Sequence, residues 1–340
     1  MRIFRDHSLL GHNTFGIDAK AACFVEYDNE DELKQLLADY MDNRYPLPLI
    51  HIGEGSNFLF SGNFNGTVAH SCIRGVEEVE RDDHSVLLRV GAAENWDSLV
   101  ATTIDRGFYG LENLSLIPGE VGAAAVQNIG AYGAEAEQFI EAVEGITIHG
   151  KATTYTHDEC QYAYRSSVFK HDLKDRFYVT HVLLRLSLQF VPNLSYGALQ
   201  RLLEENSLDA ASVSAADIRR LIVNFRKEKL PQPSEVGSAG SFFVNRVVSE
   251  QVFAKLQADY PDMPHFKAPN GVKIPAGWLI EQTGWRGKNL GRAGVWAKQA
   301  LVLVNLGGAT GEEIVTLSQT IQKDVYEKFG IMLNPEANIV

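Results

Sequence analysis

The segment with the most distinctive composition in this chain is Leu114-Ser-Leu-Ile-Pro-Gly-Glu-Val-Gly-Ala-Ala-Ala-Val-Gln-Asn-Ile-Gly-Ala-Tyr-Gly133. Glycines and alanines follow one another so closely that few bulky polar side chains remain, chiefly Gln127 and Asn128. A backbone without obstructing Cβ atoms can approach a bulky ligand closely. Small residues also allow tight packing between structural elements, and the segment alone favours neither interpretation.

A second glycine-rich turn, Gly53-Glu-Gly-Ser-Asn57, follows a predicted β-α-β unit. The unit consists of a strand at 22–27, a helix from about Asn29 and a strand at 47–52. The turn begins like a dinucleotide-binding fingerprint, but Phe58 replaces the third glycine and opens a strand, which argues against a Rossmann helix. Taken alone, an ordinary β-turn is the simpler interpretation. Backbone N–H groups of such a turn can still hold a pyrophosphate, and the two segments together favour a large phosphate-bearing cofactor.

Composition limits the possible partners and compartments. The chain has 340 residues, a formal charge of −12 and a pI near 5.3. This length predicts two or three domains, and the charge disfavours nucleic acid and anionic membranes. No signal peptide or membrane-spanning run is predicted. Cys23, Cys72 and Cys160 lack the spacing of a disulfide framework or a zinc site. We therefore expect buried or unreactive thiols, no metal site and a cytoplasmic location.

Beyond Gly133 a mixed β region continues to about Phe190, and the chain after Pro233 combines helices and strands without an evident repeat. A mixed α+β class fits this pattern. A helix is expected at 215–227, capped by Ser214 and ended by Pro231-Gln-Pro233, which we interpret as a domain boundary. Further helices are predicted near 250–259, 275–282 and 310–329, with a strand near 301–306 between the last two. Thr310-Gly-Glu-Glu313 is a capping box.

Three polar positions could carry chemistry. Arg165, in Tyr164-Arg-Ser-Ser167, suits a carboxylate or a phosphate, although a surface cation is the simpler interpretation. Ser241 follows a glycine-serine turn and is either an acid or a turn residue, since no hydrolase motif accompanies it. Glu336, taken alone, would be interpreted as a solvent-exposed surface residue. From spacing alone, the chain is a cofactor-binding α+β enzyme.

Read together, these segments resemble the UDP-N-acetylenolpyruvoylglucosamine reductase family along nearly the whole chain, in its longer form. The order and spacing of the motifs are more specific than any one of them. The matching motifs are Asn13-Thr-Phe-Gly16, Gly53-Glu-Gly-Ser-Asn57, Gly110-Leu-Glu-Asn-Leu114, Ile117-Pro-Gly119, Val126-Gln-Asn-Ile-Gly-Ala-Tyr-Gly133, Tyr164-Arg-Ser-Ser-Val-Phe-Lys170, Gly240-Ser-Phe-Phe-Val-Asn245, Ala276-Gly-Trp-Leu-Ile280 and Asn334-Pro-Glu336.

The resemblance implies an α+β protein with an FAD-binding domain of the vanillyl-alcohol-oxidase type and a smaller substrate-binding domain. Residues 1–70 and 71–228 would be the two FAD-binding subdomains, the second with a linker helix. Residues 229–340 would bind substrate, with the C-terminal segment returning to the active site. NADPH would reduce non-covalent FAD, and the enolpyruvyl ether of UDP-N-acetylglucosamine would then be reduced to give UDP-N-acetylmuramate for peptidoglycan.

Residue roles follow from the same resemblance. Arg165 and Glu336 would polarise the enolpyruvyl carboxylate, Glu336 in a protonated or hydrogen-bonded form, and Ser241 would protonate C2. Residues matching substrate contacts are Tyr196, Lys229, Asn245 and Gln299. Residues in the segments that wrap FAD are Gly53, Gly55, Ser56, Asn57, Gly119, Gly122, Ala123, Asn128 and Gly130.

Several positions depart from the family pattern. Glu54 would place a negative charge near the pyrophosphate, and Ala123-Ala124 replaces hydroxyl residues that could bind phosphate. Phe266 stands near the position of a substrate-contacting tyrosine, and Ala337-Asn-Ile-Val340 lacks an arginine often found there. Two alternatives stay open: a flavin oxidase of the same fold, and a non-catalytic FAD or nucleotide-sugar sensor. A monomer is expected.

Overall fold

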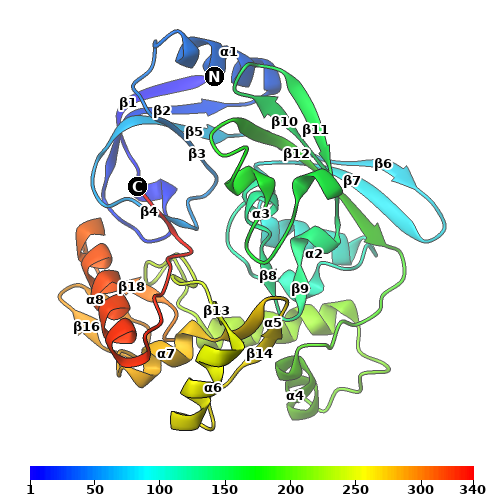
Figure 1. Ribbon diagram of the computed structural model, residues 1–340. Coiled ribbons are helices and arrows are strands. Elements are labelled where there is room, and N and C mark those ends of the chain that lie inside the picture. The colour runs from blue at the N-terminus through cyan, green and yellow to red at the C-terminus, as the bar shows by residue number, and fades with distance from the viewer. The chain divides into compact units, whose positions relative to one another are not determined.

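The computed structural model describes residues 1–340, which divide into two compact units (Figure 1). Each unit is assembled from segments that are distant in sequence. The first comprises Met1–His7, Ala21–Glu54 and Asn65–Arg226, and the second comprises Ser8–Lys20, Gly55–Phe64 and Lys227–Val340. The glycine turn is therefore divided, with Gly53 and Glu54 in the first unit and Gly55 in the second.

A four-stranded sheet of order β1-β2-β5-β3 contains the predicted β-α-β unit. Its strands are β1 (Arg2–Ser8), β2 (Lys20–Tyr27), β3 (Leu49–Ile52) and β5 (Phe64–Ser71). Helix α1 (Glu30–Met41) begins where predicted, because the Asn29 side chain accepts the Glu32 N–H. Its buried Leu33, Leu36 and Leu37 pack in one apolar cluster with Cys23 and Val25 of β2.

The larger sheet of the first unit is antiparallel, of order β11-β10-β12-β7-β6. Its strands are β6 (Val76–Arg81), β7 (Ser85–Gly91), β10 (Ile140–Thr147), β11 (Ala152–Thr156) and β12 (Phe177–Ser187). Apolar side chains of this sheet share a core with helices α2 (Trp96–Asp105) and α3 (Val121–Gln127). Leu114, Val121, Ala124 and Ala125 of the glycine-rich segment belong to this core.

Short elements complete the first unit. They are the hairpin β8 (Gly130–Ala131) and β9 (Ala134–Glu135), the 3₁₀ turns η2 (Glu112–Leu114), η3 (Ala136–Gln138), η4 (Asp158–Cys160) and η5 (Val168–Lys170), and helix α4 (Gly197–Glu205). Helix α5 (Ala215–Lys229) starts at the predicted cap, where Ser214 Oγ accepts the Asp217 N–H. Buried Leu199 of α4 packs with Ile218 and Ile222 of α5.

The second unit combines small sheets with three helices. Its elements are η1 (Leu10–His12), β4 (Phe58–Leu59), β13 (Arg246–Val248), α6 (Glu250–Asp259), β14 (Phe266–Ala268), β15 (Gly271–Ile274), α7 (Ala276–Gln282), β16 (Asn289–Leu290), β17 (Ala293–Val295), β18 (Leu303–Asn305), α8 (Gly311–Phe329) and β19 (Asn338–Ile339). The predicted capping box of α8 is formed: Thr310 Oγ1 accepts the Glu313 N–H, and Glu313 accepts the Thr310 N–H. The expected α+β class is confirmed.

Gly311, the first residue of α8, has no room for a side chain. A Cβ there would overlap the carbonyl oxygen of Phe60, whereas a Cβ at Gly62 would meet nothing within 4 Å. We expect Gly311→Ala to lower the free energy of unfolding by about 1–3 kcal/mol through overpacking, measured by urea denaturation. Gly62→Ala should stay within about 0.5 kcal/mol of wild type. Equal stability of the two variants would contradict this packing.

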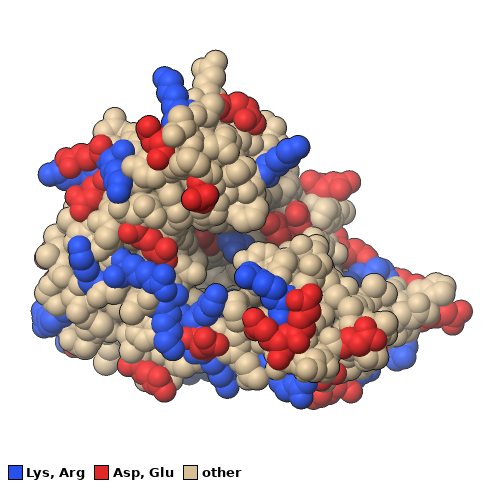
Figure 2. Space-filling model, turned by 90° about the horizontal axis from the view of Figure 1, so that it is seen from below, with Lys and Arg blue, Asp and Glu red and all other residues tan.

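The surface carries cations among its more numerous acidic groups (Figure 2). On the face shown in Figure 2, Lys and Arg side chains stand beside Asp and Glu side chains, so the net charge of −12 does not remove local cations. No helix combines the length and the apolar character needed to cross a bilayer.

Candidate functional site

The glycine-rich segment forms a turn, in which only Pro118 is exposed, followed by the short helix α3 in the first unit. Gly119 has a φ of +122°, a conformation that few side-chain-bearing residues adopt. Gly122 is required by packing, because a Cβ there would lie 2.8 Å from the Cβ of Ala92. Ala123 is partly exposed, so its small side chain leaves the nearby backbone accessible. Both possibilities left open by the sequence are therefore present in this segment: tight packing at Gly122 and an accessible backbone near Ala123.

Glu54 connects the two glycine-rich segments within the first unit. One carboxylate oxygen accepts a hydrogen bond from Asn95 Nδ2 at 2.9 Å, and the other accepts one from the Gly119 N–H at 3.1 Å. Such bonds to an ionised acceptor are roughly twice as strong as neutral ones. The side chain expected to repel a pyrophosphate is thus held by internal donors, and it has a structural role that the sequence did not reveal.

Gly53 packs against a second carboxylate. A Cβ at Gly53 would lie 2.9 Å from Glu120 Oε2. The other oxygen of Glu120 lies 3.0 Å from Nε2 of His70. Glu120 is buried, and the sequence-based interpretation did not single it out. Both acidic side chains beside the turn are therefore bonded to the protein itself.

Arg165 lies against the end of the glycine-rich segment. Its guanidinium donates to the carbonyls of Asn128 at 3.2 Å and Gly130 at 2.6 Å. A Cβ at Gly130 would lie 2.9 Å from Arg165 Nη1, so the glycine allows this approach. Arg165 itself has a φ of +54°, which costs free energy for a residue other than glycine and is often found at functional sites. Lys170 Nζ donates to the Arg165 carbonyl.

Asn128 shapes this loop rather than presenting its side chain to a ligand. It ends α3 with a φ of +46° and is fully buried. Its side-chain amide donates to Glu135 and to the Ala163 carbonyl, and its oxygen accepts the Glu137 N–H. A bound cofactor could therefore contact the backbone of the residues next to Asn128, but not its side chain.

The second unit joins the other half of the glycine turn to the C-terminal segment. Gly55 has a φ of +70°, and a Cβ there would overlap the His12 carbonyl oxygen. Ser56 is partly exposed beside it. Asn57 Nδ2 donates to the Glu336 carbonyl at 3.2 Å, and the Asn338 N–H donates to the Asn57 carbonyl at 2.9 Å. Strands β4 and β19 continue this pairing in parallel.

Ser241 and Glu336 are brought together by the backbone. The Glu336 N–H donates to the carbonyl of Phe242, the residue after Ser241, at 2.7 Å. Phe243 and Pro335 form a bridge beside this bond, and Ser241 forms one with Val302. Ser241 is exposed and Glu336 partly exposed, while Phe242 and Phe243 are buried and anchor the segment. Arg165 lies in the first unit and these two residues in the second.

The residues matched to substrate contacts are also divided between the units. Asn245 caps α7, because its Oδ1 accepts the Ala276 N–H at 2.9 Å, and Gln299 Oε1 accepts the Leu301 N–H at 3.3 Å. Lys229 is the exposed last residue of α5, and its carbonyl accepts from Trp296 Nε1. In the first unit, exposed Tyr196 lies edge-on to Tyr132, with ring centroids 5.6 Å apart.

Tyr132 and Arg226 were not singled out from the sequence. Arg226 Nε donates to the Leu116 carbonyl at 3.2 Å, and its guanidinium interacts with the Tyr132 hydroxyl. Burial lowers the pKa of Arg226, although the tyrosine and Asp97 oppose this shift. The sequence feature that could have pointed to Tyr132 is its position between the two glycines of Gly130-Ala-Tyr-Gly133. The pair places a cation beside Tyr132, whose ring in turn contacts Tyr196.

The residues around the glycine turn and α3 in the first unit are suited to holding an FAD group. Gly53, Ala123 and Gly130 are partly exposed positions with little or no side chain, so their backbone can approach phosphates. The nearby carboxylates of Glu54 and Glu120 are held by internal partners and do not stand unpaired beside them. These residues could therefore contribute the first unit's part of a cofactor site.

Comparison with known proteins agrees with this architecture. Residues 21–156 match the FAD binding domain family, and residues 232–340 match the family described as UDP-N-acetylenolpyruvoylglucosamine reductase, C-terminal domain. A structure of the reductase from Thermus caldophilus superimposes with a TM-score of 0.69 at 23% identity, covering 100% of this chain and 99% of that one, which supports the fold.

Sequence relatives are closer. The UDP-N-acetylenolpyruvoylglucosamine reductase of Bacteroides fragilis is 49% identical over 335 residues, covering 98% of this chain and 99% of its own. The corresponding reductase of Porphyromonas gingivalis is 44% identical over 344 residues, with both chains covered completely. The chain therefore belongs to the UDP-N-acetylenolpyruvoylglucosamine reductase family.

Proposed function

We propose that this enzyme reduces UDP-N-acetylglucosamine enolpyruvate to UDP-N-acetylmuramate in peptidoglycan precursor synthesis, with Arg165, Ser241 and Glu336 at the reacting carbons. Full-length similarity to reductases at 44–49% identity supports the activity. The observation that carries the residue assignment is the pairing of the Ser241 and Glu336 segments through the bond from the Glu336 N–H to Phe242. A sensor or an oxidase would have no need to keep an acid and a hydroxyl on adjoining segments.

FAD, bound without a covalent link and reduced by NADPH, would supply hydride chemistry at the enolpyruvyl group, from its N5 to C3. The backbone of Gly53, Gly119, Gly122, Ala123 and Gly130 would hold it in the first unit, with Asn128 shaping the loop. Gly55, Ser56 and Asn57 would contribute from the second unit. The partial exposure of Gly53, Ser56, Asn57, Ala123 and Gly130 supports this assignment, whereas Gly55, Gly119 and Gly122 are buried.

A hydride added at C3 would leave carbanion character at C2, next to the substrate carboxylate. Preorganised donors stabilise such developing charge far better than mobile water does. The Arg165 guanidinium is preorganised by the carbonyls of Asn128 and Gly130. Glu336, protonated or hydrogen-bonded, would bind the same carboxylate, and the Ser241 hydroxyl would deliver the proton to C2. A free alcohol is a poor acid, so neighbouring groups must stabilise the alkoxide as it forms.

Lys229 is expected to contact the substrate diphosphate, and Tyr196, Asn245 and Gln299 the remainder of the nucleotide sugar. A hydrogen bond to a charged group contributes about 1.5–3 kcal/mol, so Lys229→Ala should raise the substrate KM by roughly 10–100-fold. Flavin content should change little. Lys227→Ala removes an exposed lysine of the same helix and serves as the control. An unchanged KM in Lys229→Ala would show that the diphosphate binds elsewhere.

One spectroscopic experiment separates the possible functions. The purified protein is supplied with FAD under anaerobic conditions, then with NADPH, then with the enolpyruvate substrate. We expect the flavin band to bleach with NADPH and to return only with the enolpyruvate. Return only with oxygen would indicate a flavin oxidase, and failure to bind FAD would indicate a nucleotide-sugar sensor or a paralogue that has lost the activity.

Three further assignments belong to the same proposal. Residues 1–70 and 71–228 would act as the FAD-binding subdomains and residues 229–340 as the substrate domain. The C-terminal segment would reach the active site through its pairing with Asn57. The enzyme would work as a cytoplasmic monomer without a nucleic-acid partner, which gel filtration with light scattering would test.

A further inference from the structure

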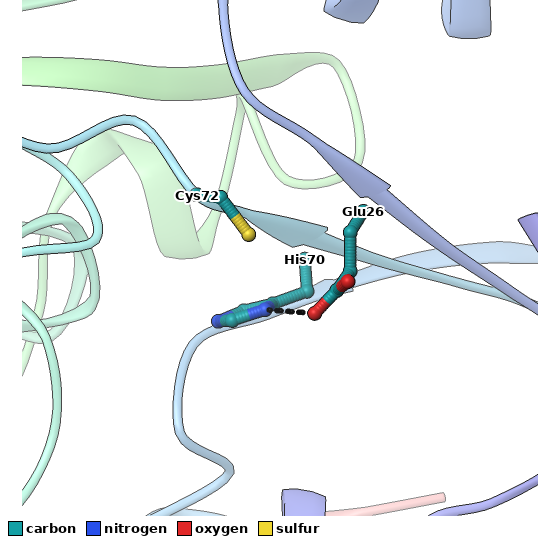
Figure 3. A group of neighbouring side chains, drawn as sticks. All are labelled: Glu26, His70 and Cys72. Carbon is teal, nitrogen blue, oxygen red and sulfur yellow. Dashed lines mark ion pairs between the residues drawn. The ribbon is translucent and has the colours of Figure 1, made fainter. Parts of the chain in front are cut away.

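A glutamate, a histidine and a cysteine from neighbouring strands meet in the first unit, in residues that the reductase chemistry does not use (Figure 3). Glu26 lies on β2, His70 on β5, and Cys72 directly after β5. One potential ligand atom from each side chain lies within 4.8 Å of the other two. Nδ1 of His70 is 3.7 Å from Glu26 Oε1. The three side chains turn toward one another in Figure 3.

The opposite side of the imidazole gives a second, independent indication. Nε2 of His70 lies 3.0 Å from the buried Glu120 carboxylate. A carboxylate can only accept, so Nε2 carries the hydrogen. Nδ1 interacts with the Glu26 carboxylate, and if a metal ion displaced the proton from Nδ1, the lone pair of the neutral ring would lie on the side of Glu26 and Cys72. Histidine ligands of metal ions usually donate their other N–H to a carboxylate in this way.

Arg2 arranges the other two side chains. Its Nε donates to Glu26 Oε2 at 2.9 Å, which leaves Oε1 facing His70. Its Nη2 lies 3.3 Å from Cys72 Sγ. Burial, together with the Glu26 carboxylate, raises the pKa of the Cys72 thiol, and Arg2 opposes that shift. A coordinated metal ion deprotonates a thiol outright, so a thiolate and a carboxylate would balance the charge of a divalent cation.

We propose that Glu26, His70 and Cys72 bind Zn²⁺, with Glu120 orienting His70. One sulfur, one nitrogen and one oxygen ligand suit zinc, whereas Ca²⁺ and Mg²⁺ require oxygen ligands. Zinc-ligand bonds of about 2.0–2.3 Å place neighbouring tetrahedral ligands roughly 3.3–3.8 Å apart. The separation of Glu26 and His70 already fits, and Cys72 needs only a small side-chain movement. Water would complete the tetrahedron.

The site would connect to the glycine turn through Glu120. One oxygen of this residue lies where a Cβ on Gly53 would meet it, the other contacts His70, and the residue is the N-cap of α3. A metal on His70 would therefore hold Glu120 in place beside the turn. A proton is the competing occupant: burial lowers the pKa of His70, but Glu120 and Glu26 outweigh it and the net shift is upward.

Isothermal titration of the FAD-loaded enzyme with ZnCl₂ tests the site, followed by zinc X-ray absorption of the loaded protein. We expect one zinc per chain, with one sulfur near about 2.3 Å and nitrogen or oxygen ligands near about 2.0–2.2 Å. Glu120→Gln should weaken binding by about 10–100-fold, and Cys72→Ser and His70→Gln by more. An unaltered flavin spectrum in Cys72→Ser would show that the variant is folded.

His157→Gln is the matched control, since His157 lies 3.5 Å from the carboxylate of Asp158 without a third ligand. It should bind zinc like the wild type. The proposal is overturned if no stoichiometric zinc binds, if the absorption spectrum contains no sulfur ligand, or if Cys72→Ser leaves the Kd unchanged. The first of these results would assign the position beside His70 Nδ1 to a proton.

Discussion

Ser241→Ala is expected to bind FAD and to be reduced by NADPH like the wild type, yet to turn over enolpyruvate at least about 10²-fold more slowly, the lower end of general-acid contributions. The hydroxyl is exposed and lies on the segment paired with Glu336, so its removal leaves the buried anchors Phe242 and Phe243 in place. Stopped-flow spectroscopy measures both half-reactions separately. Only the reoxidation of flavin by enolpyruvate should slow.

The control for this variant is Ser249→Ala, which removes a serine that caps α6 in the same unit. Losing the cap should cost about 1 kcal/mol of stability without changing either half-reaction. If Ser241→Ala reoxidises at the wild-type rate with enolpyruvate, another group delivers the proton to C2. If the reduction by NADPH slows equally, Ser241 acts on the cofactor instead.

Arg165→Met should lower kcat by about 10²–10³-fold, the effect of removing one preorganised donor from a site of developing negative charge. Methionine keeps much of the side-chain length and removes the charge and the bonds to Asn128 and Gly130. Steady-state kinetics with enolpyruvate provide the measurement. Arg106→Met, which removes an exposed arginine lying over the Phe108 ring, is the control.

Gly130→Ala tests whether the position of the Arg165 guanidinium matters separately from its charge. The added Cβ would lie 2.9 Å from Arg165 Nη1 and 2.9 Å from the Ala134 carbonyl oxygen, so the guanidinium must shift while its charge stays. We expect an intermediate loss of kcat. Wild-type kcat in both Arg165→Met and Gly130→Ala would remove this arginine from the reaction.

Local features of the sequence were sufficient to predict many element boundaries. Ser214 and Thr310 cap the helices that they were expected to cap, because a cap involves only residues within one turn. Asn29 caps the helix that was predicted to begin near it. The glycine-rich segments, the α+β class and the family membership also followed from motifs in the sequence. The catalytic and substrate assignments remain predictions that the proposed variants test.

Contacts between distant segments were decided only by the tertiary structure. Glu54 was expected to oppose a pyrophosphate, but Asn95 and Gly119 hold its carboxylate. No metal site was expected because the cysteines lack a ligand spacing, yet β2 carries Glu26 to His70 and Cys72. Cross-strand neighbours depend on sheet order and register, which are set by packing of the whole sheet and not by spacing along the chain. For this protein the sequence determined which residues cap, turn and match a family, and the fold determined which side chains meet.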